Sequence, residues 1–341
     1  MSSDLLEDLR KTTRQALTAG GGDVVDQLDL AALLLDGQTG GLGMGEREMV
    51  LVGEEIGRQP APSAFLPSVI LAATLLSHGN VDGVELAKDL ARNRYAVALA
   101  GLNAAGTAMP PAVVATGGPG GWLLDGTSWG LAPPSDFDAL LVVAGTGTGL
   151  ALFVADGTAA TVTADQLDPS RGLIEVTFER VPGRMAVEAP AAAGALRAAY
   201  RRAVLAVAAE QLGVARACLE MAVEHAKTRN QFGAPIGSFQ AIKHRCAEVL
   251  LDTEFADAAI QQAIQSTGFD DLELAFLVAT KAAVSAAQSC IHVHGGIGFT
   301  WEHRTHWYLR RARVNATLFG PPGMHRNAIA ESVGVNAAGR K

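Results

Sequence analysis

Cysteine, aromatic residues and charge are all scarce in this chain of 341 residues. Its 3 cysteines, Cys218, Cys246 and Cys290, are too few and too scattered for a disulfide framework or a metal knuckle. We expect them to act as small apolar residues on helix faces, in a reducing cytoplasm. Charged residues make up 18% and hydrophobic residues 49%, which is typical of a globular rather than a disordered protein.

Long apolar runs and an excess of positive charge are also missing. No run long enough to span a bilayer stands out, and the first residues, Met1–Asp8, lack the pattern of a secretory signal. The formal net charge of -8 argues against nucleic acid as a main partner. We therefore expect a cytoplasmic protein without a membrane or nucleic-acid partner, long enough for two or three domains.

The periodicity of apolar residues changes twice along the chain. Residues 1–95 follow a helical pattern interrupted by loops. Residues 96–183 show short strand patterns separated by Gly, Pro and Asp, with a hairpin signal at Asp125 and Gly126. Several short strands at this spacing predict a small antiparallel barrel. The helical period returns from 190 to 341.

The stretch 229–240 reads Arg-Asn-Gln-Phe-Gly-Ala-Pro-Ile-Gly-Ser-Phe-Gln and separates two long helical patterns. Its glycines and proline interrupt the period, so we expect a helical hairpin with these side chains at its turn. Arg229 offers a fixed fork of donors suited to phosphate or carboxylate. Phe232 and Phe239 offer flat faces for a ring system. A plain connecting loop between helices is the alternative interpretation.

A second glycine-rich stretch ends a helical pattern near the C-terminus. Asp270 and Glu273 resemble a capping box at its start, and the pattern runs to His292 and His294, which two glycines follow. Glycines at a helix end allow positive φ and close backbone approach. Histidines two positions apart point to different faces, so a shared metal is not expected. A capped helix with incidental histidines is the alternative.

The residue sequence of both stretches resembles motifs of the acyl-CoA dehydrogenase family. Arg-x-Gln-Phe-Gly-x-Pro-Ile followed by Phe-Gln resembles the family's flavin-binding loop. His-x-His-Gly-Gly-Ile-Gly-Phe-Thr-Trp-Glu-His, followed by Arg-Arg-Ala-Arg, resembles the family's Gln-x-x-Gly-Gly-x-Gly signature and Arg-Asp-Ala-Arg, with His292 in the place of the glutamine. Shorter segments of the first 183 residues, such as Gly-Trp-Leu-Leu-Asp-Gly, are similar to the family too.

The resemblance implies an α+β, mostly α fold with three domains. These would be an N-terminal helical domain (1–95), a middle small antiparallel β-barrel (96–183) and a C-terminal four-helix bundle (190–341). It further implies FAD-dependent introduction of an α,β double bond into an acyl-CoA thioester, with electron-transfer flavoprotein as the acceptor. In the family, the two stretches hold the adenosine and diphosphate of FAD across a subunit interface. The matching residues are Arg229, Gln231, Phe232, Phe239, Gln240, His292, His294, Gly295 and Gly296.

The sequence departs from the family where the reactive end of the flavin is seated. The family's Thr-Glu-Pro-x-Ala-Gly-Ser and Trp-x-Thr-Asn segments are replaced by Gly-Leu-Asn-Ala-Ala-Gly at 101–106 and Trp-Gly-Leu-Ala-Pro-Pro at 129–134. The catalytic glutamate is missing as well. Phe319 and Ala203 occupy the two positions where family members carry it, and neither side chain accepts a proton. We therefore expect no catalytic residue in this chain.

The chain thus keeps the half-site that reaches across an interface and lacks the catalytic half. It resembles the small, non-catalytic subunit of heteromeric α2β2 acyl-CoA dehydrogenases of actinobacterial steroid side-chain degradation, which implies a larger partner subunit with the catalytic glutamate. Two alternatives stay open: a homomeric flavoenzyme with an unrecognised base, and a scaffold subunit without flavin contact. Glu210, Glu220 and Glu224 lie on the helix before Arg229 at positions typical of surface charges, so none is expected to be that base.

Overall fold

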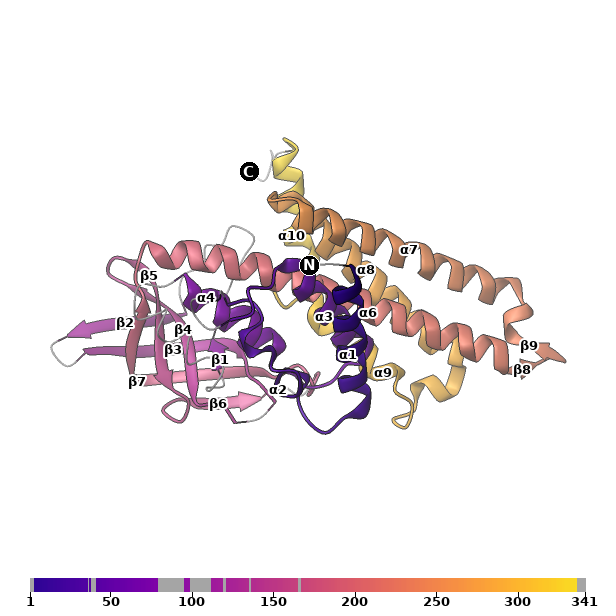
Figure 1. The fold of residues 1–341 in the computed structure, drawn as a ribbon, viewed down its shortest axis with the longest axis horizontal. Helices are drawn as coiled ribbons and strands as arrows, with labels where there is room; N and C mark the ends of the chain where they lie inside the picture. Colours follow the sequence, from indigo (N-terminus) through magenta and orange to yellow (C-terminus); the bar gives the residue numbers. More distant parts are fainter. Residues whose placement is uncertain are drawn as a thin grey trace, which may run out of the picture. The chain divides into compact units, whose positions relative to one another are not determined.

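The structure of the protein is a computed structural model, drawn in Figure 1. The described residues are 3–35, 37, 41–78, 95–98, 112–118, 121–134, 136–164 and 167–335. The first predicted flavin-seating segment, 101–106, lies outside them. The chain contains two compact units. Unit 1 comprises residues 1–10, 50–60 and 204–341, and unit 2 comprises residues 11–49 and 61–203.

Helices α1 (Ser3–Ala19), α3 (Glu46–Arg58) and α6 (Ala191–Thr228) each contribute residues to both units. The predicted helical patterns before residue 96 are confirmed where the structure describes them. Unit 2 also contains short helical segments in its N-terminal part: α2 (Val24–Gln27), the 3-10 segment η1 (Leu30–Ala32), the π-helical segment η3 (Phe65–Ala72) and α4 (Ala73–Ser77). Every residue of η3 is buried, as its apolar sequence predicts.

A seven-stranded sheet forms the rest of unit 2. Its strands are β1 (Tyr95–Ala98), β2 (Val113–Gly118), β3 (Gly121–Leu131), β4 (Ala139–Thr146), β5 (Gly149–Asp156), β6 (Thr161–Ala164) and β7 (Leu173–Val187). The order is β1-β3-β2-β4-β5-β7-β6, and further pairings of β1 with β4 and of β3 with β7 curl the sheet into a barrel around a buried apolar core. Most neighbours are antiparallel, but β1 and β2 pair with β4 in parallel. The expected barrel is confirmed, with these two parallel pairings added.

The hairpin predicted at Asp125 and Gly126 is wrong. Strand β3 continues through both residues, and its first residue, Gly121, pairs with Gly118 of β2. Gly126 has φ 129, and a Cβ there would lie 2.2 Å from the carbonyl oxygen of Ala112. The register with β7 shifts between Leu124 and Gly126, so the glycine serves a strand irregularity rather than a reversal.

Unit 1 is a helical bundle. It contains the greater part of α6 together with α7 (Gln240–Gln265), α8 (Phe269–His294), α9 (Thr305–Asn315) and α10 (Pro322–Ser332). By length and composition alone, Phe269–Phe299 is apolar enough to cross a bilayer, which the sequence analysis did not detect. Fourteen residues of α8 are buried in this bundle, so packing inside a folded unit accounts for the apolar character.

Two glycines bring α3 and α6 into backbone contact. A Cβ at Gly57 would lie 1.9 Å from the carbonyl oxygen of Glu210, and a Cβ at Gly213 would lie 1.9 Å from that of Glu54. The closeness is reciprocal, since each helix presents its glycine to the backbone of the other. Glu54 also accepts hydrogen bonds from Arg10 and Arg216. Glycine is therefore required at both crossing positions.

The capping box predicted at Asp270 and Glu273 is also wrong. Helix α8 begins at Phe269 after Gly268, with no side-chain cap. The carboxylate of Glu273 is buried and pairs with His325 of α10, whose ring stacks 4.2 Å from that of Phe276. The glutamate thus joins two helices, because a buried carboxylate needs a partner more than the helix start needs a cap.

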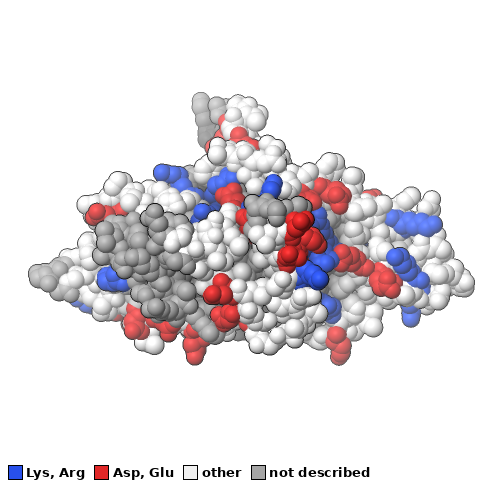
Figure 2. Space-filling model, in the orientation of Figure 1, with Lys and Arg blue, Asp and Glu red and all other residues white. Residues whose placement is uncertain are grey.

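Acidic and basic side chains are interspersed on the face drawn in Figure 2. Lysine and arginine do not gather there into a single basic stripe, which agrees with the acidic balance of the composition. Several charges are paired within unit 1, including Arg58 with Glu220 and Lys281 with Asp252.

Candidate functional site

The stretch 229–240 folds as a tight β-hairpin between α6 and α7, visible at the end of both helices in Figure 1. Strand β8 (Asn230–Gln231) pairs with β9 (Ala234–Pro235), and the turn residues Phe232 and Gly233 have φ of 52 and 82. Positive φ at both central residues defines a type I′ turn, which favours Asn-Gly over a bulky side chain. Phe232 therefore occupies a strained position.

The side chains predicted to hold the cofactor are exposed on this hairpin. Phe232 is 94% exposed and meets Phe239 edge to face, with ring centroids 6.1 Å apart. Arg229, Gln231 and Gln240 are exposed as well. The backbone beneath them is fixed, because the N–H of Arg229 donates to His225 and that of Ile236 donates to Arg229. The hairpin thus presents an arginine and two aromatic rings on a rigid support.

The Gly-Gly stretch caps α8. Gly295 has φ 66, and its N–H donates to the carbonyl oxygens of His292 and Ile291. A Cβ added at Gly295 or Gly296 would meet no atom within 4 Å, so the space above both glycines is open. At Gly298, by contrast, a Cβ would lie 2.8 Å from the carbonyl oxygen of Ile291. The first two glycines therefore leave room for close approach of another molecule, and the third serves packing.

Three imidazole rings connect the two stretches. The ring of His294 stacks 4.3 Å from that of His225 on α6 and lies 4.5 Å from that of His303. Burial, together with the neighbouring cationic groups, lowers the pKa of His225 and of His303. Sequence reasoning selected His294 but missed the other two. The spacing of His225 one helical turn before Arg229 was the available signal, because both residues lie at the same helix end.

His292 lies on α8 with its side chain exposed, apart from this stack. The two histidines of the Gly-Gly stretch therefore do point to different surroundings. Among the described residues, no group of three His, Cys, Asp or Glu side chains is arranged to hold a metal ion.

The three cysteines meet in one place. Cys218, Cys246 and Cys290 belong to α6, α7 and α8, and Cys218 and Cys246 line a narrow gap between these helices. Burial raises the pKa of the Cys218 thiol well above its usual value, with Cys290 adding to the effect. Cys218 and Cys290 are buried, so these two thiols fill space in the bundle as small apolar groups.

Both positions that carry a glutamate in the family are apolar and buried. Phe319 is 4% exposed, in the loop between α9 and α10 of unit 1. Ala203 is fully buried on α6 in unit 2. The expectation that Glu210 occupies a surface position is wrong, because this glutamate of α6 is buried 3.5 Å from Arg311. Glu220 and Glu224 are exposed, and Glu220 pairs with Arg58.

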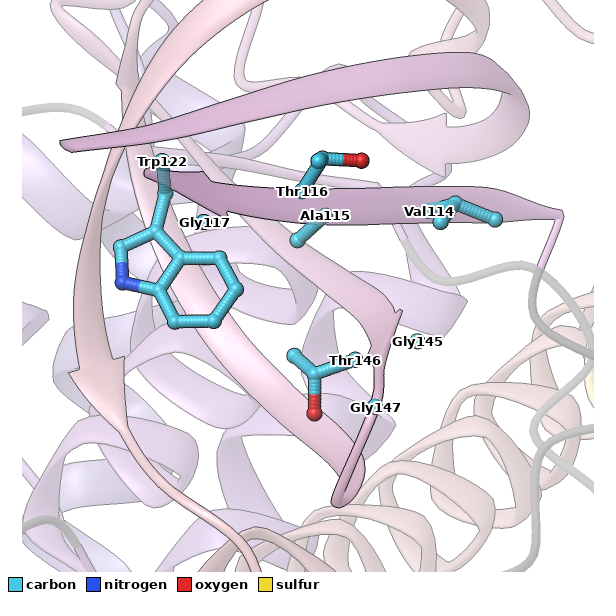
Figure 3. Close-up of a pocket in the computed structure, with 8 residues that line it drawn as sticks. All are labelled: Val114, Ala115, Thr116, Gly117, Trp122, Gly145, Thr146 and Gly147. Atoms are coloured by element: carbon cyan, nitrogen blue, oxygen red, sulfur yellow. The ribbon is translucent and has the colours of Figure 1, made fainter. Parts of the chain in front are cut away.

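A second candidate site is a hollow of about 540 Å³ in the sheet of unit 2 (Figure 3). It opens where β2 and β4 diverge beyond their single pairing of Val114 with Gly145. The indole of Trp122 forms one side and Thr146 another, as the labelled sticks show. Trp122 is the second residue of β3. The second predicted flavin-seating segment starts at Trp129, roughly 23 Å further along the strand at the usual rise per residue. The hollow is thus separate from that segment.

The hairpin and the glycine stretch together fit one half of a flavin dinucleotide. Arg229 supplies a forked donor for a diphosphate, the glycines leave open backbone, and the two phenylalanines offer faces to an adenine. The described part of segment 129–134 has an exposed Trp129 but apolar residues where the family has a threonine and an asparagine. The fit therefore extends to the adenosine and diphosphate half.

Comparison with known proteins agrees with this description. The family model "Acyl-CoA dehydrogenase, C-terminal domain" matches residues 185–334. The acyl-CoA dehydrogenase IpdE2 of Mycobacterium tuberculosis is 31% identical over 297 residues, covering 87% of this chain and 81% of that protein. FadE27 of the same organism, another acyl-CoA dehydrogenase, is 32% identical over 82% of this chain and 79% of its own length.

A solved structure with a similar fold is the ChsE4-ChsE5 complex from Mycobacterium tuberculosis. It is 25% identical, with a TM-score of 0.83, over 99% of both chains. This similarity covers the barrel and the helical bundle together. The identity to IpdE2 over most of both proteins places the chain in a family, and the cofactor half-site described above is in keeping with it. The chain belongs to the acyl-CoA dehydrogenase family.

Proposed function

We propose that this chain is the non-catalytic subunit of a heteromeric acyl-CoA dehydrogenase. In this assignment it holds the adenosine and diphosphate of FAD across an interface, and a larger partner subunit supplies the catalytic glutamate. The reaction type, introduction of an α,β double bond into an acyl-CoA thioester, is the one that the family catalyses. The proposal adds that this chain acts together with a partner subunit.

One observation carries the proposal. The two family positions for the base hold buried apolar side chains, Phe319 and Ala203, while the residues that would reach a neighbour's cofactor are exposed. A base must lie within hydrogen-bond reach of the proton that it removes. Neither site offers a titratable group, so proton removal falls to another chain. Phe232 is exposed in a strained turn, and such a side chain is what a contact with another chain would require.

FAD is the cofactor of this family, and it accepts the hydride from Cβ when bound. The contribution of this chain is to bind and orient. Arg229 pairs with the diphosphate through its guanidinium fork. Phe232 and Phe239 cover the adenine, and Gln231 and Gln240 stand beside them as hydrogen-bonding groups.

The structural neighbours support a partner and suggest a substrate class. One of them is a complex of two differently named chains, ChsE4 and ChsE5. Another, the Tcur3481-Tcur3483 pair, is described as a steroid ACAD and has a TM-score of 0.85 at 25% identity. By analogy we assign an α2β2 assembly acting on a steroid side-chain acyl-CoA, with electron-transfer flavoprotein as the acceptor.

Flavin stoichiometry tests the proposal. The chain is co-expressed with a companion acyl-CoA dehydrogenase subunit that has an intact glutamate, and FAD is measured per mass of purified complex. We expect one FAD per heterodimer, and little flavin on the chain expressed alone. Two FAD per heterodimer, or a yellow, active homomer of this chain, would contradict the proposal.

A further inference from the structure

We propose that His225, His294 and His303 form a proton-dependent anion site that holds the diphosphate of FAD beside Arg229, so that FAD is retained more tightly at low pH. The inference rests on the proposed function and adds regulation to the same half-site. It also assigns two residues, His225 and His303, that the family signature does not single out.

The first step is the geometry of the stack. His294 lies between the other two rings at 4.3 and 4.5 Å, with interplanar angles of 25° and 51°. His225 is one helical turn before Arg229, and His294 directly precedes Gly295. The stack therefore links the arginine hairpin to the open glycines, the two places where a diphosphate fits.

The second step is the charge around the stack. The groups that act electrostatically on His225 are His294, Arg229 and His303, and those on His303 are His294, Arg304 and His306. All of these are cationic or become cationic on protonation, and no carboxylate is among them. Without a ligand, burial and this repulsion lower the pKa of His225 and of His303, and a bound dianion would reverse the balance.

The third step is the hydrogen-bonding state of His294. Its Nδ1 lies 2.8 Å from the carbonyl oxygen of Cys290, so in the neutral ring Nδ1–H donates there and Nε2 is an acceptor. An acceptor cannot bind a phosphate oxygen. Protonation turns Nε2 into a donor while the bond to Cys290 is kept. Binding an anion at this ring therefore requires uptake of a proton.

Linkage then fixes the direction of the pH dependence. An anion that binds the protonated stack raises its pKa, so the added affinity is present below the raised pKa and is lost as the pH rises through it. The three rings are in contact, and repulsion allows them to share roughly one proton per site. We expect affinity at pH 6 to exceed that at pH 8 by about threefold to tenfold, within the range of a charge-assisted hydrogen bond.

The test uses the full chain and ADP-ribose, whose two phosphates are both esterified, as in FAD, and do not titrate between these pH values. Binding is followed by NMR of the imidazole carbons and by calorimetry in two buffers of different ionisation enthalpy. We expect millimolar binding that tightens from pH 8 to pH 6, with proton uptake. The triple variant His225→Gln, His294→Gln, His303→Gln should lose most of the pH dependence. His78→Gln, an exposed histidine in unit 2, is the matched control and should behave as wild type.

Equal affinity at both pH values, absence of binding, or pH dependence kept in the triple variant would each overturn the inference. In the complex, FAD release is compared at pH 6 and 8 by flavin fluorescence. Retention that depends on Arg229 but not on pH would overturn the histidine site and leave the proposed function standing. Two FAD per heterodimer would overturn the proposed function and leave the histidine site standing. If the triple variant changed only the KM for acyl-CoA, the diphosphate held would be that of CoA, and the assignment to FAD would be wrong.

Discussion

The arginine hairpin and the loop at Phe319 differ in where they place an aromatic side chain. Phe232 is 94% exposed in a turn that disfavours it, while Phe319 is 4% exposed in the bundle. The ring of Phe232 destabilises the isolated chain through its strained turn, whereas the buried ring of Phe319 stabilises the chain. The difference is what we expect if the hairpin contacts another molecule as proposed, whereas the side chain at the family's base position packs within this chain.

The strongest test of this comparison restores the missing carboxylate. Phe319→Glu places an ionisable group where the structure has an apolar side chain, so the free energy of unfolding should fall by about 3–5 kcal/mol. No dehydrogenase activity should appear in the chain alone. Urea unfolding gives the first result, and an acyl-CoA assay the second.

Phe319→Leu is the matched control, because it keeps an apolar group and should cost about 1–2 kcal/mol. A stable, flavin-loaded and active Phe319→Glu chain would mean that the position still faces a usable active site.

Removing the arginine tests the other side of the comparison. Arg229→Ala should weaken FAD retention in the complex about tenfold or more, since a charge-assisted contact contributes roughly 1.5–3 kcal/mol. Turnover should largely recover with excess FAD, because the proposed assembly has its base on the partner. Arg326→Ala, an exposed arginine on α10, should change neither quantity. Unchanged flavin binding in Arg229→Ala would make the hairpin a structural element only.

A substitution in the turn separates folding from binding. Phe232→Asn gives the Asn-Gly pair that a type I′ turn prefers, so the isolated chain should be as stable as wild type or gain about 0.5 kcal/mol. FAD retention in the complex should fall severalfold, because the exposed ring is lost. Thermal unfolding and flavin fluorescence measure the two effects. A loss of stability together with unchanged retention would contradict this account of Phe232.

The smallest expected effect concerns pH and the stability of the free chain. The pKa values of His225 and His303 are lowered from 6.5, so the unfolded state binds more protons as the pH falls. The corresponding stability is fully present above pH 6.5 and should decline as the pH drops below it. In the double variant His225→Gln, His303→Gln, the decline from pH 7 to 5.5 in chemical unfolding should be shallower; an identical decline would exclude these histidines as its source.

Periodicity located the helices and most strands because burial of one face leaves its mark along the sequence. The hairpin prediction at Asp125 and Gly126 failed, because residues that often form turns lie here in a strand irregularity. The capping-box prediction at Glu273 failed, because its carboxylate pairs with a residue of α10 that lies 52 positions away in the sequence. Contacts between distant segments carry no local signal.

The candidate site shows the same division. Arg229 and the two glycines were recognisable from their sequence motifs, and the structure leaves the arginine exposed and the space above the glycines open. Their contact with FAD stays a prediction. The histidine stack was not recognisable, since His225, His294 and His303 come from three separate segments. Their proximity depends on how α6 and α8 pack, so only the fold brings these rings together.

The reciprocal contact of Gly57 and Gly213 has a consequence for mutational tolerance. Each glycine accommodates the backbone of the other helix, so even alanine at one position would force the helices apart, and a second change could not restore the contact. In a saturation library scored only for soluble expression, these two positions should be nearly as depleted as stop codons. The exposed hairpin, to which we assign the cofactor contacts, should pass the same screen with little loss. A screen for foldedness would thus rank the two glycines above the residues proposed to bind FAD.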